Sequence, residues 1–431
     1  MKDRKDKRPE ADDYHFIKET IKRKPVDKPE IAKKVLAIAA GGILFGGCAA
    51  VTIAVVMPIA EAKIGMIPEE RADISLADPE QMTASIEAAA PTALPSEEAQ
   101  TDTKTEMEYP APLEYYENIY QEVLEVSEEP RKALVRVSGI REDADLLDNS
   151  ILSSGNEEGI IFLKNDSDFY ILTTAKGFEG GEQIQVTFSN GAVAEAELCK
   201  KDTQTGLAVV CVPSSRLTEQ TKNEISVASL SKSYSLLQAK PVIAIGSPTG
   251  DYDAVVYGMV TSISGKFTVA DAEYNILATD MKGSLDGTGV LLDTSGDVIG
   301  FMLQTDSDSN IIRAVSIAQL RPLIEILSNG DAIKYLGVHG TSISKEQAET
   351  LKVPQGIYVD NVETDSPAMI AGIQSGDIIG SLNGEEVGSM QSYSVKLQKM
   401  NAGERAKIVL YRRGADGIYG EMHFSVMVEE R

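Results

Sequence analysis

The stretch TDMKGSLDGTGVLLDTSGDVIGF, residues 279–301, decides the fold that we expect for this chain. A strand that ends in Thr-Asp runs into a glycine-rich bend, followed by a short apolar strand, a Ser-Gly-Asp turn and a second strand, VIGF. Gly287 and Gly289 flank Thr288, so the bend is a tight turn that displays one hydroxyl group. This hydroxyl is the first candidate functional group.

Short strands with turn signals between them recur on both sides of this bend. They fall into two clusters of about six strands, and the polar stretch 214–236 separates the clusters. This pattern is typical of a two-barrel, mainly β domain. A helix is predicted over 316–327, and Asn329-Gly330 is the signal that ends it.

The last hundred residues have a different pattern. Ser366 is a predicted N-cap with Pro367 at the first helical position, and Gly372 is predicted to end that short helix. Asn383-Gly384 is a strong hairpin signal, and a further helix is predicted around 392–400. This order of caps and turns indicates a separate small domain.

Residues 279–292 resemble the frame T-D-x-x-x-N-P-G-N-S-G-G-P-L, which presents the nucleophilic serine in the HtrA family of trypsin-like serine proteases. The run DSPAMIAGIQSGDII, 365–379, resembles a PDZ domain of the permuted bacterial type. The resemblance covers about 113–431. It implies a trypsin-like double β-barrel over 113–329 and a PDZ domain over 330–431.

The resemblance also assigns the three catalytic positions of the family to residues of this chain. ILTTAKGF places Lys176 where the family has its histidine, and DTQTGLAVV places Gly206 where it has its aspartate. Thr288 stands in the serine position. Asp286 replaces the glycine whose backbone helps to form the oxyanion hole, and a carboxylate there would repel a developing oxyanion.

These replacements predict a pseudoprotease. A hydroxyl attacks a carbonyl near neutral pH only when a neighbouring base takes its proton. The chain has three histidines, His15, His339 and His423, and none lies between 113 and 330. The alternative is an atypical endopeptidase in which Lys176 is the base for Thr288, which requires a lysine whose pKa is lowered by desolvation.

The PDZ resemblance implies a peptide-binding groove. The segment YLGV resembles the carboxylate-binding loop, whose backbone N–H groups receive a peptide's terminal carboxylate, while the following strand pairs with the peptide. Three residues at helical spacing are expected to form the other wall, or else the core of the small domain. The predicted groove residues are Tyr335, Leu336, Gly337, Val338, Tyr393, Leu397 and Met400.

The N-terminal part predicts a single membrane anchor. Segment 1–34 is rich in Lys and Arg, and 35–60 carries no charge over 26 residues, long enough to cross a bilayer as a helix. The basic flank predicts a cytoplasmic N-terminus and extracytoplasmic folded domains at the cell membrane. A cleaved signal sequence is the alternative, although 34 polar residues would be an unusually long leader. Segment 61–112 is acidic and poor in large apolar residues, which predicts a disordered linker.

Composition limits the partners. The formal net charge of -25 argues against nucleic acid, because an acidic surface repels phosphates. Cys199 and Cys211 are predicted on neighbouring strands, either as a disulfide or as small buried hydrophobes, and the cysteines have no metal-ligand spacing. We expect no metal and no cofactor.

The resemblance implies exposed or C-terminal peptide segments as ligands, in envelope protein quality control. It also implies a homo-oligomer, a trimer, or co-assembly with an active HtrA-like protease. The aromatic residues that could mediate a trimer are Tyr115, Tyr116 and Tyr120.

Overall fold

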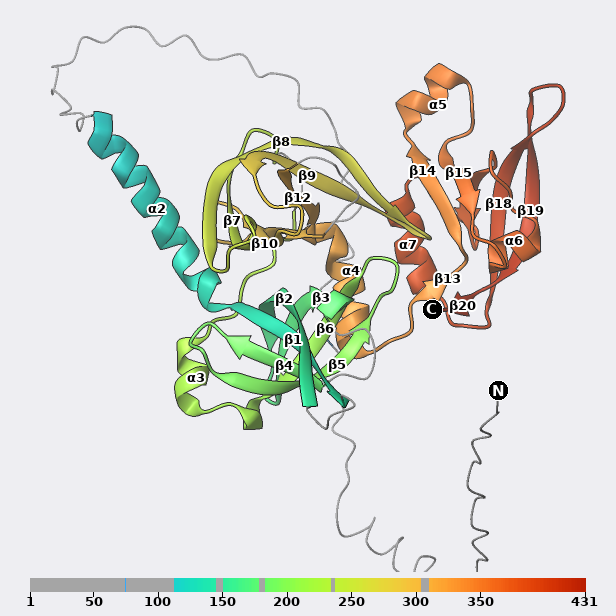
Figure 1. Ribbon diagram of the computed structural model, residues 1–431. Helices are drawn as coiled ribbons and strands as arrows, with labels where there is room; N and C mark the ends of the chain where they lie inside the picture. Colours follow the sequence, from blue (N-terminus) through green and yellow to red (C-terminus); the bar gives the residue numbers. More distant parts are fainter. Residues whose placement is uncertain (1–73, 75–111, 145–149, 178–182, 234–236, 304–309) are drawn as a thin grey trace, which may run out of the picture. The chain divides into compact units, whose positions relative to one another are not determined.

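The computed structural model describes residues 74, 112–144, 150–177, 183–233, 237–303 and 310–431 (Figure 1). The predicted segments 1–34 and 35–60 lie outside the described residues, as does the linker 61–112 apart from residues 74 and 112. Among the helices that can be described, none is both long and apolar enough to cross a membrane. The described part is mainly β, with two closed barrels followed by a smaller domain, as the sequence predicts.

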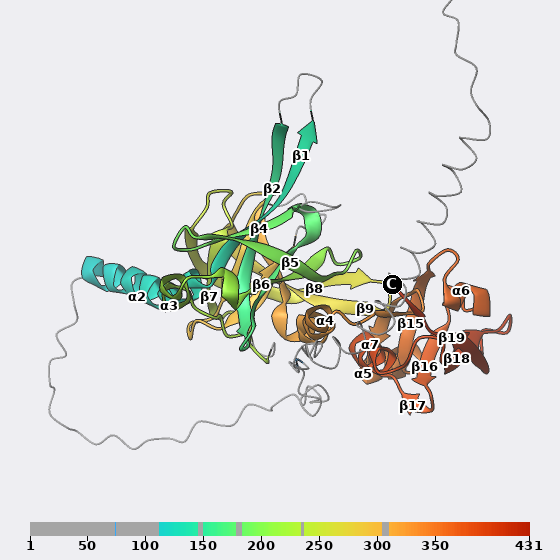
Figure 2. The same ribbon diagram turned by 90° about the horizontal axis from the view of Figure 1, so that it is seen from below.

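The first barrel closes in the strand order β1-β2-β3-β6-β5-β4. In β4, alternate side chains are buried, so that Ile184, Val186 and Phe188 fill the interior. β1 and β2 pair over eleven residues and extend as a ribbon beyond the rest of the barrel (Figure 2). The strands are β1 (Leu134–Ala144), β2 (Ser150–Lys164), β3 (Asp168–Thr174), β4 (Gln183–Phe188), β5 (Val193–Lys201) and β6 (Leu207–Pro213).

The second barrel closes in the order β10-β11-β12-β9-β8-β7. Its longest ribbon is formed by β8 and β9, which pair as far as Val269 and Ala272. The strands are β7 (Pro241–Ser247), β8 (Ala254–Val269), β9 (Ala272–Lys282), β10 (Thr288–Leu292), β11 (Val298–Met302) and β12 (Ile311–Ser316).

Helices close the barrels at their edges. α4 (Ile317–Asn329) packs against β5, β6 and β11, and Gly330 ends it in the left-handed region at φ 72°, as predicted. The other short elements are η1 (Ala175–Gly177), η2 (Ser214–Arg216) and α3 (Glu219–Glu224).

α2 (Pro112–Lys132) contacts β7 and β8. Tyr116, Tyr120 and Val123 share one face of this helix; Val123 is buried, whereas Tyr116 and Tyr120 are 61% and 60% exposed. This face therefore does not pack as a unit on the described part of the chain, because only the C-terminal half of the helix reaches the barrel.

The smaller domain is built on the sheet β14-β15-β16-β18-β19, with β17 paired to β16 and a separate pair β13-β20. Ser366 caps α6 by accepting a hydrogen bond from the Met369 N–H at 3.2 Å, and Gly372 ends this helix at φ 92°, both as predicted. The elements are β13 (Lys334–Tyr335), β14 (Val338–Ile343), α5 (Lys345–Leu351), β15 (Gly356–Val362), α6 (Pro367–Ala371), β16 (Ile378–Leu382), β17 (Glu385–Glu386), α7 (Met390–Gln398), β18 (Arg405–Arg413), β19 (Tyr419–Met427) and β20 (Glu429–Glu430).

Cys199 and Cys211 lie on the neighbouring strands β5 and β6, as predicted. Cys211 is buried within the core of the first barrel and Cys199 packs against that core while partly exposed. Cys211 thus has the surroundings of a small buried hydrophobe.

Candidate functional site

One cleft brings together the three residues that the sequence places at the catalytic positions. Lys176 and Gly206 belong to the first barrel and Thr288 to the second. All three line the same cavity of about 420 Å³. The other lining residues are Glu157, Thr174, Ala175, Lys201, Asp202, Thr203, Thr205 and Leu303.

Backbone contacts hold Lys176 and Gly206 side by side. Lys176 lies in η1, directly after β3, and the N–H of its neighbour Ala175 donates to the Gly206 carbonyl at 2.8 Å. Gly206 follows a turn that Asp202 organises, since this buried carboxylate accepts from the Thr205 hydroxyl at 2.8 Å. Gly206 itself has φ 72°, a left-handed conformation that the turn requires. The turn therefore places a backbone carbonyl, not a carboxylate, beside η1.

The bend before Thr288 depends on a close approach of two strands. A Cβ on Gly289 would lie 2.2 Å from the Ile245 carbonyl oxygen, so this position requires glycine. Asp286 is exposed, and its N–H, at the position of the expected oxyanion donor, donates to the Ser284 hydroxyl at 3.3 Å. The turn therefore still presents the Thr288 hydroxyl to the cleft, while the Asp286 N–H is hydrogen-bonded within its own turn.

Glu157 of β2 lines the cleft, and the adjacent Glu158 is buried; neither residue was predicted from the sequence. Glu157 accepts a hydrogen bond from the Thr174 hydroxyl at 2.5 Å. Glu158 is 7% exposed, and burial raises its pKa to about 7, although the positive charge of Arg136 acts in the opposite direction. Lys176, by contrast, is exposed to solvent. The Glu-Glu pair lies in a strand of mixed polarity, so nothing in the sequence singles out either carboxyl.

The predicted carboxylate-binding loop lies between β13 and the start of β14. Gly337 has φ 89°, and a Cβ there would lie 2.3 Å from the Ser366 Cβ, so the loop requires glycine. The side chains of Leu336 and Val338 are fully buried. Tyr335 donates its hydroxyl hydrogen to Glu363 at 2.5 Å. The buried side chains of Leu336 and Val338 and the Tyr335–Glu363 hydrogen bond thus hold the loop in place.

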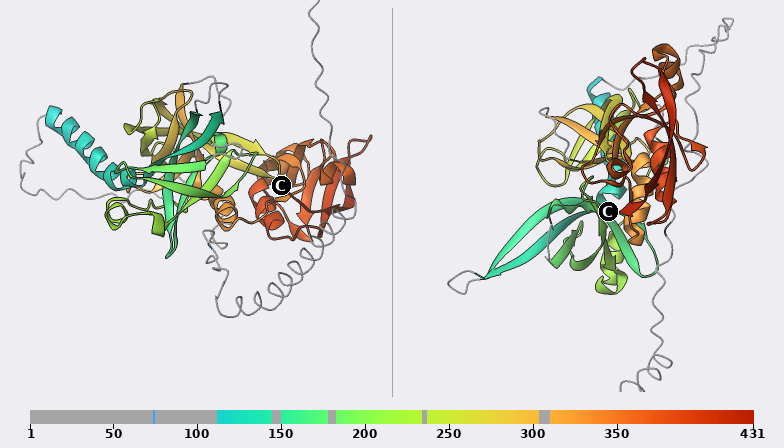
Figure 3. Two further views of the ribbon diagram at one scale, coloured as in Figure 1. Left: turned by 60° about the horizontal axis from the view of Figure 1, so that its bottom comes forward. Right: turned by 90° about the vertical axis from the view of Figure 1, so that its right-hand side faces the viewer.

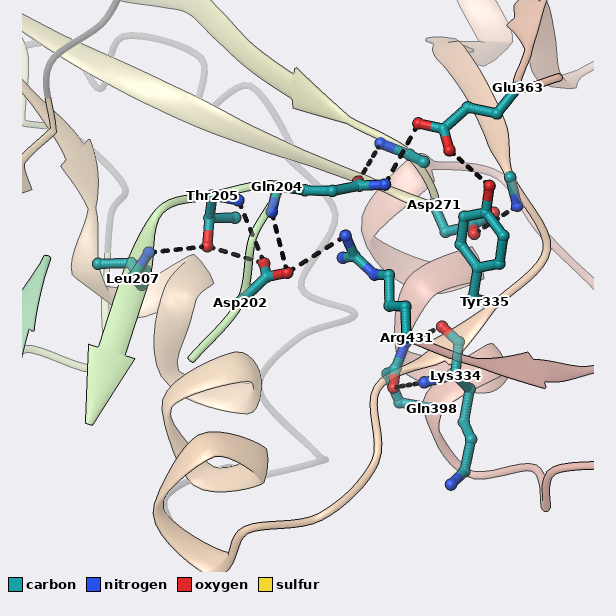
Figure 4. A network of polar contacts seen from close by, with 12 residues as sticks. Asp202, Gln204, Thr205, Leu207, Asp271, Lys334, Tyr335, Glu363, Gln398 and Arg431 are labelled. Atoms are coloured by element: carbon teal, nitrogen blue, oxygen red, sulfur yellow. Dashed lines mark hydrogen bonds and ion pairs between the residues drawn. The ribbon is translucent and has the colours of Figure 1, made fainter. Parts of the chain in front are cut away.

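A carboxylate from the second barrel accepts hydrogen bonds from the backbone N–H groups of this loop. Asp271, at the turn between β8 and β9, accepts from the Leu336 and Gly337 N–H groups at 2.7 and 2.8 Å through Oδ2 and from the Val338 N–H at 3.1 Å through Oδ1. Burial raises the pKa of Asp271, and these hydrogen bonds oppose the rise. Figure 4 shows this contact within a larger polar network. No sequence signal had singled out Asp271.

The other predicted groove residues divide between two roles. Tyr393 on α7 is fully buried and donates its hydroxyl hydrogen to Asp271 at 2.9 Å. Leu397 is a member of the core of the smaller domain, and so is Met400, which lies just beyond α7. The structure thus brings Tyr393 to the loop and places Leu397 and Met400 in the core.

Comparison with known proteins gives the same two domains. A family model described as trypsin-like peptidase domain matches residues 158–301, and one described as PDZ domain matches 298–417. The serine protease Do-like HtrB of Bacillus subtilis is 32% identical over 278 residues, covering 59% of each chain. The chain is HtrA-like in fold and domain order.

Further relatives agree with an HtrA-like assignment. The periplasmic serine endoprotease DegP of Salmonella typhimurium is 26% identical, covering 57% of this chain and 52% of DegP. The solved structure of the HtrA-type protease AlgW with a decapeptide has a TM-score of 0.52 at 21% identity, covering 72% of this chain and 98% of AlgW. The chain spans about three fifths or less of the length of HtrB and DegP, while it spans nearly all of AlgW, whose likeness concerns the fold.

Proposed function

We propose that this HtrA-like chain is a membrane-anchored pseudoprotease that captures exposed or C-terminal peptide segments through its PDZ domain. Its folded domains would act outside the cytoplasm, in envelope protein quality control or in regulating an active relative. The observation that carries the proposal is the cleft itself: it gathers Lys176, Gly206 and Thr288, and no histidine is among the described residues that line it.

The surroundings of Thr288 support the loss of acyl transfer. The sequence holds no histidine from 113 to 330, so no loop of either barrel supplies an imidazole. Lys176 is exposed, whereas a lysine that serves as a base is held in a buried, desolvated site. The Asp286 N–H meets the Ser284 hydroxyl instead of an open oxyanion position. Base, orienting carboxylate and oxyanion donor are therefore all altered together.

The geometry of the carboxylate-binding loop supports the proposed peptide binding. Three consecutive backbone N–H groups converge on one carboxylate, which is the chemistry that recognises the end of a peptide. β14, which follows the loop, is an edge strand of its sheet, so it offers backbone groups for an added strand. The relative AlgW has been solved with a decapeptide, which is consistent with peptide binding by this chain.

Fluorophosphonate labelling and casein cleavage by the purified full chain test the pseudoprotease. We expect neither reaction, and we expect Thr288→Ala to behave like the wild type. The rival hypothesis, an endopeptidase that uses Thr288 with Lys176, is favoured by their presence in one cleft. Cleavage that disappears in both Thr288→Ala and Lys176→Met would establish that rival and refute the pseudoprotease.

A second experiment tests the PDZ function on its own. The full chain is exposed to a pool of decapeptides with randomised C-terminal residues and free carboxyl termini, and bound peptides are identified by mass spectrometry. Gly337→Val should abolish selective capture, because the new side chain collides with Ser366 and distorts the loop. Gly384→Val is the matched control, since Gly384 also has a positive φ but faces open space in the same domain. Equal capture by wild type and Gly337→Val would contradict this function.

The exposed tyrosines of α2 support assembly as a further part of the proposal. Tyr115, Tyr116 and Tyr120 are each more than half exposed, on a helix whose N-terminal half leaves the barrel. Exposed aromatic residues of this kind are enriched at protein interfaces. Sedimentation of the full chain and of a variant with the three tyrosines changed to serine tests this point. A trimer that persists in the variant would exclude this face as the interface.

A further inference from the structure

The turn between β8 and β9 reaches from the second barrel to the carboxylate-binding loop. β8 and β9 both contact β14, and β9 also contacts α7 (Figures 1 and 3). At the turn, Asp271 takes the left-handed conformation at φ 62°, which aspartate tolerates better than most residues. The ribbon thus ends in a carboxylate that is aimed at the loop.

Asp271 satisfies the loop in the way that a peptide's last residue would. Its two carboxylate oxygens accept all three N–H groups of Leu336, Gly337 and Val338. Its own backbone N–H donates to the Val338 carbonyl at 2.8 Å, which is the start of a strand-like pairing along β14. A terminal carboxylate of a bound peptide needs the same three donors. The loop cannot hold both groups at once.

The contact between Asp271 and the loop is buried and hydrogen-bonded. Asp271 is 2% exposed and Tyr393, which donates to its Oδ1 atom, is fully buried. A buried carboxylate is tolerated when several donors surround it, and hydrogen bonds to a charged acceptor are the stronger ones. The four donors come from two elements of the smaller domain, the loop and α7, which are also the elements expected to bind peptide.

We propose that Asp271 is an internal ligand of the PDZ carboxylate-binding loop, which a peptide's free terminal carboxylate displaces when it binds. This inference rests on the proposed peptide-binding function and adds its regulation. The loop is closed to external peptides while the β8–β9 turn is docked. The apparent affinity for peptide is lowered in proportion to the docked fraction.

Displacement of the turn also reaches the cleft. The N–H of Ala270, next to Asp271, donates to Gln204 Oε1 at 2.9 Å, and Gln204 Nε2 donates to Glu363 at 3.2 Å. Gln204 belongs to the turn 202–206 that lines the cleft, and Asp202 of that turn lies 3.2 Å from Arg431 Nη1 (Figure 4). Peptide binding therefore breaks a contact at the wall of the cleft. By reciprocity, a ligand that orders the cleft in this arrangement weakens peptide binding.

Binding of the free-carboxyl decapeptide pool to the full chain tests the proposal. Asp271→Ala should bind the pool at least tenfold more tightly than the wild type, and Asp271→Asn should show a smaller gain because an amide supplies one acceptor atom in place of two. The same pool with amidated C-termini should gain nothing. Asp251→Ala, an exposed aspartate of another hairpin of the same barrel, is the matched control and should leave affinity unchanged.

The outcomes separate this proposal from the function on which it rests. Equal affinity of wild type and Asp271→Ala, with binding still abolished by Gly337→Val, overturns the internal ligand and leaves the peptide-binding function intact. Binding that Gly337→Val does not alter, or no binding by any variant, overturns both.

Hydrogen exchange of the wild type gives an answer even where Asp271→Ala fails to fold. Saturating the chain with the pool should raise amide exchange at Ala270 and Asp271 at least tenfold, since these N–H groups lose their acceptors on Gln204 and Val338. Unchanged protection of these amides in the peptide-bound chain would overturn the proposal.

Discussion

Replacing Glu158 with glutamine should remove a pH-dependent weakness of the first barrel. Glu158 Oε2 has no hydrogen-bond partner among the described residues, and burial raises the pKa of this carboxyl from 4.5 to about 7. The charged groups that act on it are Arg136, which lowers the pKa, and Glu157 and Asp253, which raise it. Glutamine keeps the shape of the protonated acid and cannot ionise.

The sign follows from where the proton is held. Between pH 4.5 and about 7 the folded chain keeps the Glu158 proton while the unfolded chain has lost it, so the free energy of unfolding falls as pH rises. Each pKa unit corresponds to about 1.4 kcal/mol, which gives a total loss of about 3 kcal/mol by pH 8. Below pH 4.5 both states are protonated and the loss is absent. Glu158→Gln should therefore match the wild type at pH 4 and exceed its stability by about 3 kcal/mol at pH 8.

Amide hydrogen exchange in β2 and β3 measures this difference. Comparing wild type and variant at the same pH cancels the intrinsic pH dependence of exchange, so the ratio of rates reports the stability change. Glu117→Gln, on the exposed part of α2, is the matched control and should show no difference at any pH. A variant that is less stable than the wild type at pH 8 would refute the reasoning, because it would mean that the ionised carboxylate is stabilised by Arg136.

Two further substitutions test the packing on which the two sites depend. The side chain of Asp377 is 1% exposed and accepts two hydrogen bonds of 2.7 Å from Arg412. Asp377→Asn should lower the free energy of unfolding of the smaller domain, measured by calorimetry, by about 3 kcal/mol; a loss below about 1 kcal/mol would show the pair to be dispensable. Gly289→Ala places a Cβ 2.2 Å from the Ile245 oxygen at φ 137° and should cost more than about 3 kcal/mol, whereas Gly191→Ala, at φ 82° in open space, should cost about 1 kcal/mol; equal urea midpoints would contradict the close approach.

Local signals explain how much of the fold could be predicted. Ser366, Pro367 and Gly372 bound α6 as the sequence indicates, because caps are decided by neighbouring residues. The bend at Thr288 could be predicted because only glycine fits beside Ile245, and that requirement leaves a mark in the sequence. The meeting of Lys176, Gly206 and Thr288 in one cleft was predicted from a family resemblance rather than from any local rule.

Contacts between distant segments could not be predicted in this way. Asp271 lies 65 residues before Leu336, and a single aspartate between two strands reads as an ordinary turn residue. Glu158 gave no signal either, since its burial depends on the neighbouring strands and on Arg136. The exposure of Tyr116 follows from where α2 leaves the barrel, which helical periodicity alone does not specify.

The docking of Asp271 on the loop gives the second barrel a role that does not depend on catalysis. β8 and β9 belong to the closed barrel, and their register carries Asp271 to the loop. If the turn closes the loop to peptides, the barrel determines whether Asp271 reaches the loop. A ligand in the cleft would then change the docking of the turn through Gln204. Deleting the turn should then open the loop without altering the barrel, whereas destabilising the barrel should open the loop as well.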